Sequence, residues 1–317
     1  MKLATLDDGT PDGALVVTDG ERFLRATGIA ATMREALDGW DEVQPALRSL
    51  VPRLVHGEPL LAVRCLAPLP RTFEWLDGSA YISHVALVRR ARGAELPARL
   101  REEPLMYQGS GTFFGPRAPI RVFAPECGAD FEAELGVILR GTELGTSAED
   151  ALDRIALVVL LDDVTLRGLV PAELEKGFGF VQSKPPTAFA PLAVTPDELG
   201  AAFRGGRLHA RLVVTRSGER FGELPTGPEM HFSFGDLVAH AARTRPLAAG
   251  TVIGSGTISS EDARFGQACI VERRMRETIE EGAPLTPYLR EGEVVTIEAF
   301  DANGASLFGA IVQEVIA

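Results

Sequence analysis

One uninterrupted apolar run does most to limit the folds open to this chain. It extends from Ile155 to Leu161 and is typical of a strand that is buried on both of its faces. Asp162 and Asp163 follow it directly. A carboxylate at the end of a buried strand needs a partner, because an unpaired buried charge is costly. We therefore expect Asp163 to belong to a functional site and Asp162 to point the other way, although an N-cap or an Asx turn would also explain either residue.

Two glutamates in a second predicted strand strengthen this expectation. Glu132 and Glu134 alternate with apolar residues in the run Asp-Phe-Glu-Ala-Glu-Leu, so on a strand they share one face. Like charges side by side are costly in a dry environment unless a cation neutralises them, and an all-oxygen set suits Mg²⁺ or Ca²⁺. The alternative is the wet face of a half-exposed strand. Arg140 is the first basic residue after the pair, which favours a strand that runs into the core.

A histidine near a further aspartate is the candidate base. The segment from Gly78 to Arg90 can form a helix, and Asp77 precedes His84 by seven residues, which is two helical turns. The two side chains would share one face if both residues were helical. The alternative for His84 is a structural histidine whose ring nitrogens are satisfied by its neighbours.

A lysine and a glycine-rich segment complete the candidate set. Lys184 lies in a loop stiffened by Pro185 and Pro186, and its alternative is a solvated surface lysine. The run from Gly254 to Thr257 lacks the full G-x-G-x-x-G pattern and the P-loop lysine, so we interpret it as backbone that lines a site. The chain also has no G-x-S-x-G elbow, which disfavours a serine hydrolase of the common kind.

Charge and composition argue against several classes of protein. The 317 residues carry a net charge of −12 and the arginines are scattered, so a nucleic-acid partner is not expected. The first residues contain no apolar leader, and no apolar stretch approaches the roughly 20 residues that span a bilayer, so we expect a cytoplasmic protein with no membrane partner. Cys65, Cys127 and Cys269 are far apart in sequence and are expected to be reduced, buried thiols without a zinc or disulfide role.

The pattern of elements predicts two unequal parts and a β-rich α+β fold. Residues 1–69 read as a small N-terminal α+β domain, and the break from Leu66 to Pro70 separates it from a domain that covers residues 70–317. The larger part lacks the strict strand–helix alternation of a doubly wound sheet. The expected strands are Leu15–Val17, Phe23–Ala26, Phe131–Leu139, Ile155–Leu161, Leu208–Thr215, Gly250–Ile258, Val294–Phe300 and Leu307–Val312, with a helical region from Met33 to Leu54 and turns at Thr215–Gly218 and Asp301–Gly304.

The order of these signals along the chain closely resembles the fumarylacetoacetate hydrolase family, and in particular its shorter bacterial members. The resemblance covers most of the chain and implies a mixed β-roll catalytic domain behind a small N-terminal domain. It also implies a bound Mg²⁺ or Ca²⁺, with Mn²⁺ as a further option, no organic cofactor, and a homodimer. The motifs that carry it are Asp77 with His84, Tyr107-Gln108-Gly109, Phe131-Glu132-Ala133-Glu134, Asp162 to Arg167, Ser183-Lys184-Pro185, Gly254 to Ser259 and Cys269-Ile270-Val271-Glu272.

The resemblance also implies a role for each matching residue. The metal ligands would be Asp77, Glu132, Glu134 and Asp163; His84 would activate water, Glu272 would orient His84, and Lys184, Thr257 and Tyr107 would contact the substrate. One arginine among Arg89, Arg90 and Arg92 would meet a substrate carboxylate. This chain departs from the family pattern at Asp162, where the family commonly has Asn, and near Val170, where longer members carry a substrate-binding Gln.

The resemblance therefore implies metal-dependent hydrolysis of a carbon–carbon bond in a diketo acid. Fumarylacetoacetate or another 3-acylpyruvate is the expected small-molecule substrate, as in tyrosine degradation and other aromatic amino acid catabolism. One alternative is a 2-oxo acid hydratase, isomerase or decarboxylase that uses the same metal scaffold. Another is a binding protein that retains the metal without turnover.

Overall fold

The buried strand β10 (Ile155–Asp162) runs through the middle of a large, mostly antiparallel sheet in the computed structural model, which describes residues 1–60, 65–91, 95–96 and 98–317. Every residue of β10 is buried, as its unbroken apolar sequence predicts. Within the described residues the sheet has eleven strands, of which β12 (Ala188–Phe189) pairs with β10 beside the main path. The order along that path is β4 (Glu58–Pro59), β3 (Arg22–Arg25), β2 (Ala14–Thr18), β1 (Lys2–Leu6), β13 (Ala193–Val194), β10, β9 (Ala133–Thr142), β18 (Leu247–Gly254), β5 (Trp75–Gly78) and β6 (Met106–Gln108).

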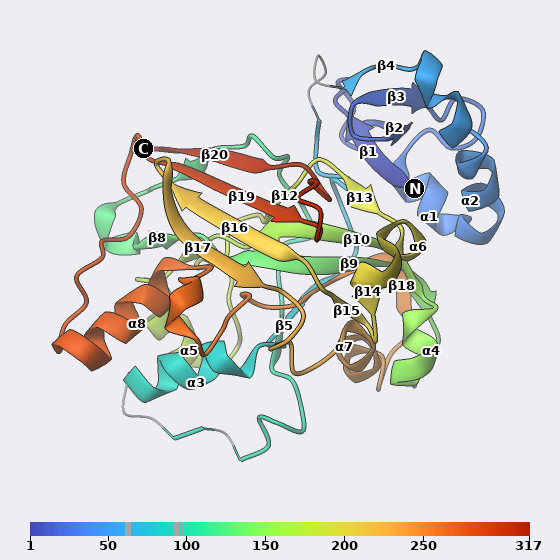
Figure 1. The fold of residues 1–317 in the computed structure, drawn as a ribbon. Helices are drawn as coiled ribbons and strands as arrows, with labels where there is room; N and C mark the ends of the chain where they lie inside the picture. The colour runs from blue at the N-terminus through green and yellow to red at the C-terminus, as the bar shows by residue number, and fades with distance from the viewer. Residues whose placement is uncertain (61–64, 92–94, 97) are drawn as a thin grey trace.

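A second sheet packs against the first. Figure 1 shows β17, β16, β19 and β20 in front of β9 and β10. Apolar side chains of both sheets belong to one core cluster, including Leu135 and Val137 from β9 and Val214 and Ile297 from the second sheet. The strands of this sheet are β17 (Glu219–Pro225), β16 (Arg211–Arg216), β19 (Val294–Phe300), β20 (Ile311–Ile316) and β7 (Ile120–Arg121), and two small ladders join β8 (Ala129–Asp130) to β11 (Thr165–Leu166) and β14 (Phe203–Arg204) to β15 (Arg207–Leu208).

The helices are short and lie around the sheets. In Figure 1, α3, α5 and α8 gather at the lower left, and α3 and α8 are in contact. None of the described helices is both long enough and apolar enough to cross a membrane. The α-helices are α1 (Met33–Asp38), α2 (Trp40–Arg48), α3 (Ile82–Ala91), α4 (Ala148–Leu152), α5 (Val170–Lys176), α6 (Pro196–Leu199), α7 (Phe234–Ala241) and α8 (Ile270–Glu281), and 3-10 turns lie at Val51–His56, Pro125–Cys127, Gly200–Ala202 and Ala263–Phe265.

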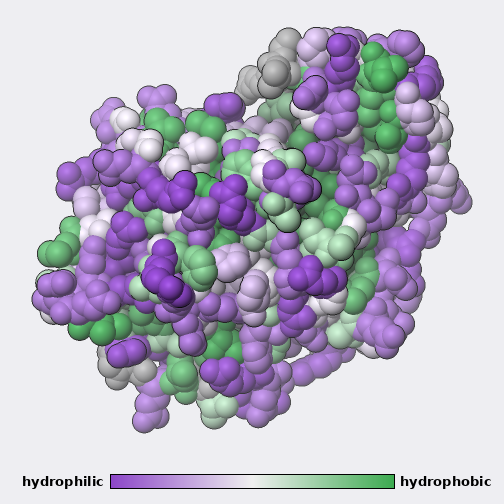
Figure 2. Space-filling model, viewed as in Figure 1, coloured by the Kyte–Doolittle hydropathy of each residue, from purple (hydrophilic) through white to green (hydrophobic). Residues whose placement is uncertain are grey.

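The N-terminal strands and helices form the blue part at the upper right of Figure 1. Strand β1 joins this part to the large sheet, because Lys2 pairs with Val194 and Leu3 with Ala193. The domain division at residues 69 and 70 stays a prediction. On the face shown in Figure 2, hydrophilic residues dominate and apolar residues form smaller patches.

Two of the predicted strands and the predicted helical region are found in the structure. β10 and β19 confirm the predicted strands at 155–161 and 294–300, and the helical region at 33–54 is confirmed as α1, α2 and a 3-10 turn. The prediction for Leu307–Val312 is wrong: the strand begins at Ile311, two residues after Gly309, which has a φ of +72°. Likewise β18 ends at Gly254, ahead of Gly256 with a φ of +72°.

Two further strand boundaries differ from the prediction. The predicted strand at Leu208–Thr215 is divided between β15 and β16, and the strand predicted from Phe131 begins at Ala133 as β9. The turn predicted at Thr215–Gly218 is confirmed, since Arg216 pairs with Glu219 across Ser217 and Gly218, which both have positive φ. That is the backbone of a two-residue hairpin turn.

Candidate active site and metal centre

Asp77 enters the site from a strand and not from a helix. It lies on β5, and α3 begins only at Ile82, so the predicted shared helical face with His84 is wrong. β5 runs parallel to β18, which pairs Asp77 with Gly254. A Cβ at Gly254 would lie 2.4 Å from Asp77 Oδ1, and that oxygen accepts the Gly256 N–H at 2.9 Å. The glycine-rich segment therefore lines the site with backbone, as predicted.

Three buried carboxylates meet beside this strand. Asp77, Glu134 and Asp163 each offer an oxygen, and these oxygens lie within 4.8 Å of one another. Burial, followed by repulsion from Asp163, raises the pKa of Asp77 to about 7. Burial, followed by repulsion from Asp77 and Asp163, raises the pKa of Glu134 well above its usual value. Neither carboxylate oxygen of Glu134 has a hydrogen-bond partner among the described residues. An orphaned buried carboxylate between two others fits a divalent cation with oxygen ligands.

Asp163 connects this group to cationic and hydroxyl donors. Its Oδ1 accepts a hydrogen bond from the Thr187 hydroxyl at 2.7 Å, and its Oδ2 accepts one from Lys184 Nζ at 2.6 Å and another from the Tyr107 hydroxyl. Tyr107 lies on β6, and Phe180 packs edge-on against its ring. Asp163 thus has protein partners on both oxygens while it remains one of the three clustered carboxylates.

Glu132 is in a different electrostatic environment. Its Oε2 accepts hydrogen bonds from Lys184 Nζ at 2.6 Å and from Thr165, and its Oε1 accepts from Arg167 and Thr257. Burial alone would raise the pKa of Glu132, but Arg167 and Lys184 outweigh it and hold the pKa well below its usual value. The three-carboxylate group does not include Glu132, so its role as a metal ligand stays a prediction.

Lys184 is buried in the site and is not the solvated lysine of the alternative interpretation. Burial alone would lower its pKa, but Asp163 and Glu132 raise it, so the amine stays charged. The preceding loop is held by Glu173 of α5, whose carboxylate accepts the backbone N–H groups of residues 181, 182 and 183. Because both near neighbours of Nζ are carboxylates, the predicted contact of Lys184 with substrate stays a prediction.

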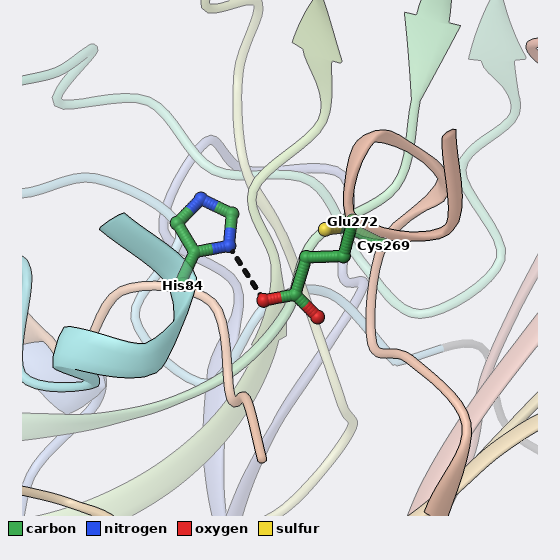
Figure 3. A group of neighbouring side chains, drawn as sticks. All are labelled: His84, Cys269 and Glu272. Carbon is green, nitrogen blue, oxygen red and sulfur yellow. Dashed lines mark hydrogen bonds and ion pairs between the residues drawn. The ribbon is translucent and has the colours of Figure 1, made fainter. Parts of the chain in front are cut away.

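The predicted pairing of histidine and glutamate is confirmed. His84 Nδ1 lies 2.9 Å from Glu272 Oε1, and Figure 3 shows the His84 ring on α3 facing the first turn of α8. Glu272 is fully buried, whereas His84 is partly open to solvent. A buried carboxylate that holds Nδ1 fixes the tautomer and leaves Nε2 as the basic nitrogen. Cys269, which is buried at the N-cap position of α8, lies beside the pair.

Sequence reasoning missed the ion pair that holds α8 in place. Arg167 Nε lies 2.9 Å from Asp130 Oδ2, and Asp130 also accepts the backbone N–H groups of Ile270 and Val271 at 2.6 and 2.9 Å. These N–H groups have no acceptor within the helix, so an external carboxylate there stabilises the helix start and fixes the position of Glu272. The available signal was that Arg167 is the first basic residue after the buried strand.

Asp162 is buried directly behind the site. Its Oδ1 accepts the Glu132 N–H at 2.8 Å, and its Oδ2 has no hydrogen-bond partner among the described residues. Burial raises the pKa of Asp162 well above its usual value. The N-cap and Asx-turn alternatives therefore do not describe Asp162, because its carboxylate accepts a hydrogen bond from the backbone of Glu132, just before β9.

A pocket of about 480 Å³ opens onto Asp77, His84 and Tyr107. Of the three candidate arginines, Arg89 lines the pocket, Arg90 is exposed outside it, and Arg92 lies outside the described residues. Thr257 donates to Glu132 and does not line the pocket, so its contact with substrate stays a prediction. The remaining wall is mostly apolar and is formed by Val85, Val88, Leu105, Met106, Val170, Leu174, Phe180 and Val271.

Comparison with family models shows which family the chain belongs to. The model described as fumarylacetoacetate (FAA) hydrolase C-terminal matches residues 74–316, which is more than half of the chain. The chain belongs to the fumarylacetoacetate hydrolase family. A second model of the family, described as fumarylacetoacetase N-terminal domain 2, matches residues 1–71.

Solved structures share this fold over the whole chain. A fumarylacetoacetate hydrolase from the psychrophilic Exiguobacterium antarcticum is 20% identical, with a TM-score of 0.68 over 100% of this chain and 99% of that chain. A maleylpyruvate hydrolase from Sphingobium sp. SYK-6, in complex with manganese(II) and pyruvate, is 17% identical with a TM-score of 0.66 over 100% and 99%. A probable 2-hydroxyhepta-2,4-diene-1,7-dioate isomerase from Mycobacterium abscessus is 18% identical with a TM-score of 0.68 over 100% and 98%.

Proposed function

We propose that this protein is a divalent-metal-dependent hydrolase that cleaves a carbon–carbon bond in a diketo acid, either fumarylacetoacetate or another 3-acylpyruvate. One observation carries the proposal. The cluster of Asp77, Glu134 and Asp163, in which Glu134 has no hydrogen-bond partner among the described residues, adjoins the pocket lined by His84, whose Nδ1 is held by Glu272. A cation site and a base beside one pocket are the two parts that hydrolysis of a ketone requires.

The cation we propose is Mg²⁺, Ca²⁺ or Mn²⁺, held by Asp77, Glu134 and Asp163 with Glu132 beside them. The chemistry of the donor set supports a hard ion, because all the donors are carboxylate oxygens. The manganese in the Sphingobium maleylpyruvate hydrolase structure adds Mn²⁺ to the candidates. When bound, such an ion polarises the two oxygens of a 1,3-dicarbonyl group and stabilises developing negative charge.

The protein residues supply the base and its orientation. His84 donates Nδ1–H to Glu272, and its Nε2 takes a proton from water as the water oxygen adds to the ketone carbon. The carbon–carbon bond then breaks, the acyl fragment leaves as a carboxylic acid, and the other fragment takes a proton as its enolate becomes a ketone. The Lys184 charge, held between Glu132 and Asp163, offsets part of the negative charge of the site.

The second candidate is an isomerase on the same scaffold. The whole-length likeness to the Mycobacterium abscessus isomerase favours it over a hydratase or a decarboxylase. Isomerisation moves protons without adding water, so it predicts a product of unchanged mass, whereas hydrolysis predicts two smaller acids.

The deciding experiment follows the ultraviolet absorbance of fumarylacetoacetate and of acetylpyruvate with metal-stripped protein, before and after Mg²⁺ or Mn²⁺ is added. We expect metal-dependent loss of the diketone signal, with two acids as products by mass spectrometry. A product of unchanged mass would favour the isomerase. Unchanged substrate after long incubation with every metal would support the binding-protein alternative.

A variant separates the base from the metal site. His84→Ala should keep the fold and the cation-dependent rise in Tm while it lowers kcat by about 10²–10⁴-fold. His240→Ala on α7 is the matched control, because His240 does not line this pocket. A fully active His84→Ala enzyme would refute the base assignment.

A further inference from the structure

A second set of metal-ligating side chains lies beside the carboxylate group and differs from it in chemistry. His84, Cys269 and Glu272 each offer one ligand atom, and the three atoms lie within 4.8 Å of one another. In Figure 3 the ring of His84 comes from α3, while the thiol and the carboxylate come from the first turn of α8. The pairing of His84 with Glu272 was predicted, but the position of the Cys269 thiol beside this pair was not.

The donor set is mixed, with one nitrogen, one sulfur and one oxygen. Imidazole, thiolate and carboxylate are the ligands that Zn²⁺ uses in proteins, and three protein ligands with an open fourth position are common in its sites. Mg²⁺ and Ca²⁺ avoid sulfur and favour the all-oxygen group instead. A thiolate, a carboxylate and a neutral imidazole carry two negative charges, which match the charge of the ion.

The surroundings allow a cation to enter and to stay. His84 lines the 480 Å³ pocket, so an ion can reach the cluster from solvent. The guanidinium of Arg167 is the nearby positive charge that would oppose the ion. It is already paired with Asp130 and Glu132, so its charge is compensated before the ion arrives.

The thiol is inert without an ion. Burial, followed by the charge of Glu272, raises the pKa of Cys269 well above its usual value, so the thiol stays protonated at neutral pH. A bound zinc ion releases that proton and takes the thiolate as a ligand. The expectation that the cysteines have no zinc role rested on their sequence spacing, which does not apply to ligands from two different helices.

We propose that His84, Cys269 and Glu272 form a second metal site that binds Zn²⁺, separate from the all-oxygen site, and that zinc there inhibits the enzyme. The inhibitory part rests on the proposed function. An ion bound to His84 Nδ1 and Glu272 Oε1 replaces the hydrogen bond that joins these atoms at 2.9 Å. The histidine then loses the orientation and basicity that water activation requires.

The binding test uses Co²⁺ as a spectroscopic substitute for zinc and needs no turnover. Metal-stripped protein is saturated with Mg²⁺ and titrated with Co²⁺, and the near-ultraviolet band that arises when a thiolate binds cobalt is recorded. We expect one equivalent of Co²⁺ to produce the band and Zn²⁺ to abolish it by displacement. Absence of the band in the unaltered protein would overturn the proposed site.

Two cysteine variants identify the ligand. Cys269→Ser should lose the band. Cys65→Ser should keep it, because Cys65 lies near the N-terminal strands, where its backbone forms a β-bridge with Leu6. A band that survives in Cys269→Ser would place the thiolate elsewhere and refute the proposal. Circular dichroism and Tm establish that each variant is folded.

The inhibition test compares each variant with its own zinc-free rate in the Mg²⁺-dependent diketone assay. We expect the zinc concentration that halves the rate to rise at least tenfold in Cys269→Ser and to stay unchanged in Cys65→Ser. Equal sensitivity of both variants would refute inhibition through this site. If no diketone is cleaved at all, the proposed function fails, while the cobalt band still decides whether the site exists.

Discussion

Glu132 and Glu134 are two residues apart and both buried, yet their hydrogen-bonding environments are opposite. Glu132 accepts hydrogen bonds from four donors, two of which are the cations Arg167 and Lys184. Glu134 has no hydrogen-bond partner on either oxygen among the described residues. The pKa of Glu132 is accordingly lowered and that of Glu134 is raised. Burial of a carboxylate alone therefore does not identify a metal ligand, and the lack of a protein partner is what distinguishes Glu134 from Glu132.

The comparison extends to the regions around each glutamate. On the paired side, Asp130, Arg167 and Lys184 connect β8, the α8 start and the loop after α5 through charges that the protein itself balances. On the unpaired side, Asp77 and Glu134 repel each other, and the oxygens of Glu134 have no hydrogen-bond partner among the described residues. The first region holds the fold around the site, and the second region is where we propose that an external ion binds.

The largest expected effect comes from the unpaired side. Glu134→Gln should abolish the rise in Tm that a divalent cation produces and lower metal-dependent turnover by about 10²-fold or more, since a ligand and its charge are both lost. The metal-free variant should be at least as stable as the unaltered protein, because an orphaned buried charge is removed. Isothermal titration with Mn²⁺ and thermal melts measure both effects. The control is Glu143→Gln, an exposed position just after β9. Retained Mn²⁺ binding in Glu134→Gln would remove the contrast between the two glutamates.

The next effect comes from the paired side and has the opposite sign for stability. Glu132→Gln leaves Arg167 and Lys184 buried with one anionic partner fewer, so the metal-free protein should lose about 3–5 kcal/mol of unfolding free energy. Urea titration in the presence of a chelator measures this loss. A variant as stable as the unaltered protein would show that the ion pairs of Glu132 do not hold the fold.

The stability of the metal-free protein should depend on pH through both Asp77, on the unpaired side, and Glu132, on the paired side. Asp77 has a pKa of about 7 in the folded state and an ordinary value of 3.8, so the folded protein holds more protons between these values. Stability should then fall as pH rises from about 4 through about 7, by an amount on the order of 4 kcal/mol. Glu132, with its lowered pKa, acts in the opposite sense, and its contribution is lost as pH falls below about 4.5. Saturating Mg²⁺ should flatten the fall toward neutral pH, because a cation favours the ionised carboxylates. Urea melts between about pH 4 and about pH 8 test this, and a stability that rises through pH 7 without metal would contradict it.

The smallest expected effect tests the charge behind the site. Asp162→Asn keeps an oxygen for the Glu132 N–H and removes a buried carboxylate oxygen that has no partner among the described residues. We expect a gain of about 1 kcal/mol in the metal-free protein and little change in Mn²⁺ affinity. A loss of stability would mean that the unpaired oxygen has a role that an amide cannot fill.

Much of the central architecture could be predicted from local patterns. The apolar run of β10, the regular alternation of β19 and the Ser217–Gly218 turn are local features that specify their own structure. The prediction at Leu307–Val312 failed because Gly309, just before β20, has a positive φ, and glycine permits that conformation without requiring it. A shared helical face of Asp77 and His84 was considered because seven residues make two helical turns, but Asp77 lies on β5, which pairs in parallel with β18.

The sequence by itself determined which residues could take part, since the motif order singled out Asp77, His84, Glu132, Glu134, Asp163, Lys184 and Glu272. Only the tertiary structure decided how these charges are partnered. The partner of each charge depends on which side chains from distant segments come within hydrogen-bond distance. Arg167 and Lys184 neutralise Glu132, whereas Glu134 has no donor among the described residues. The tertiary structure also brings Cys269 close to His84, because two helices that are far apart in the chain pack together. No sequence spacing indicates this proximity.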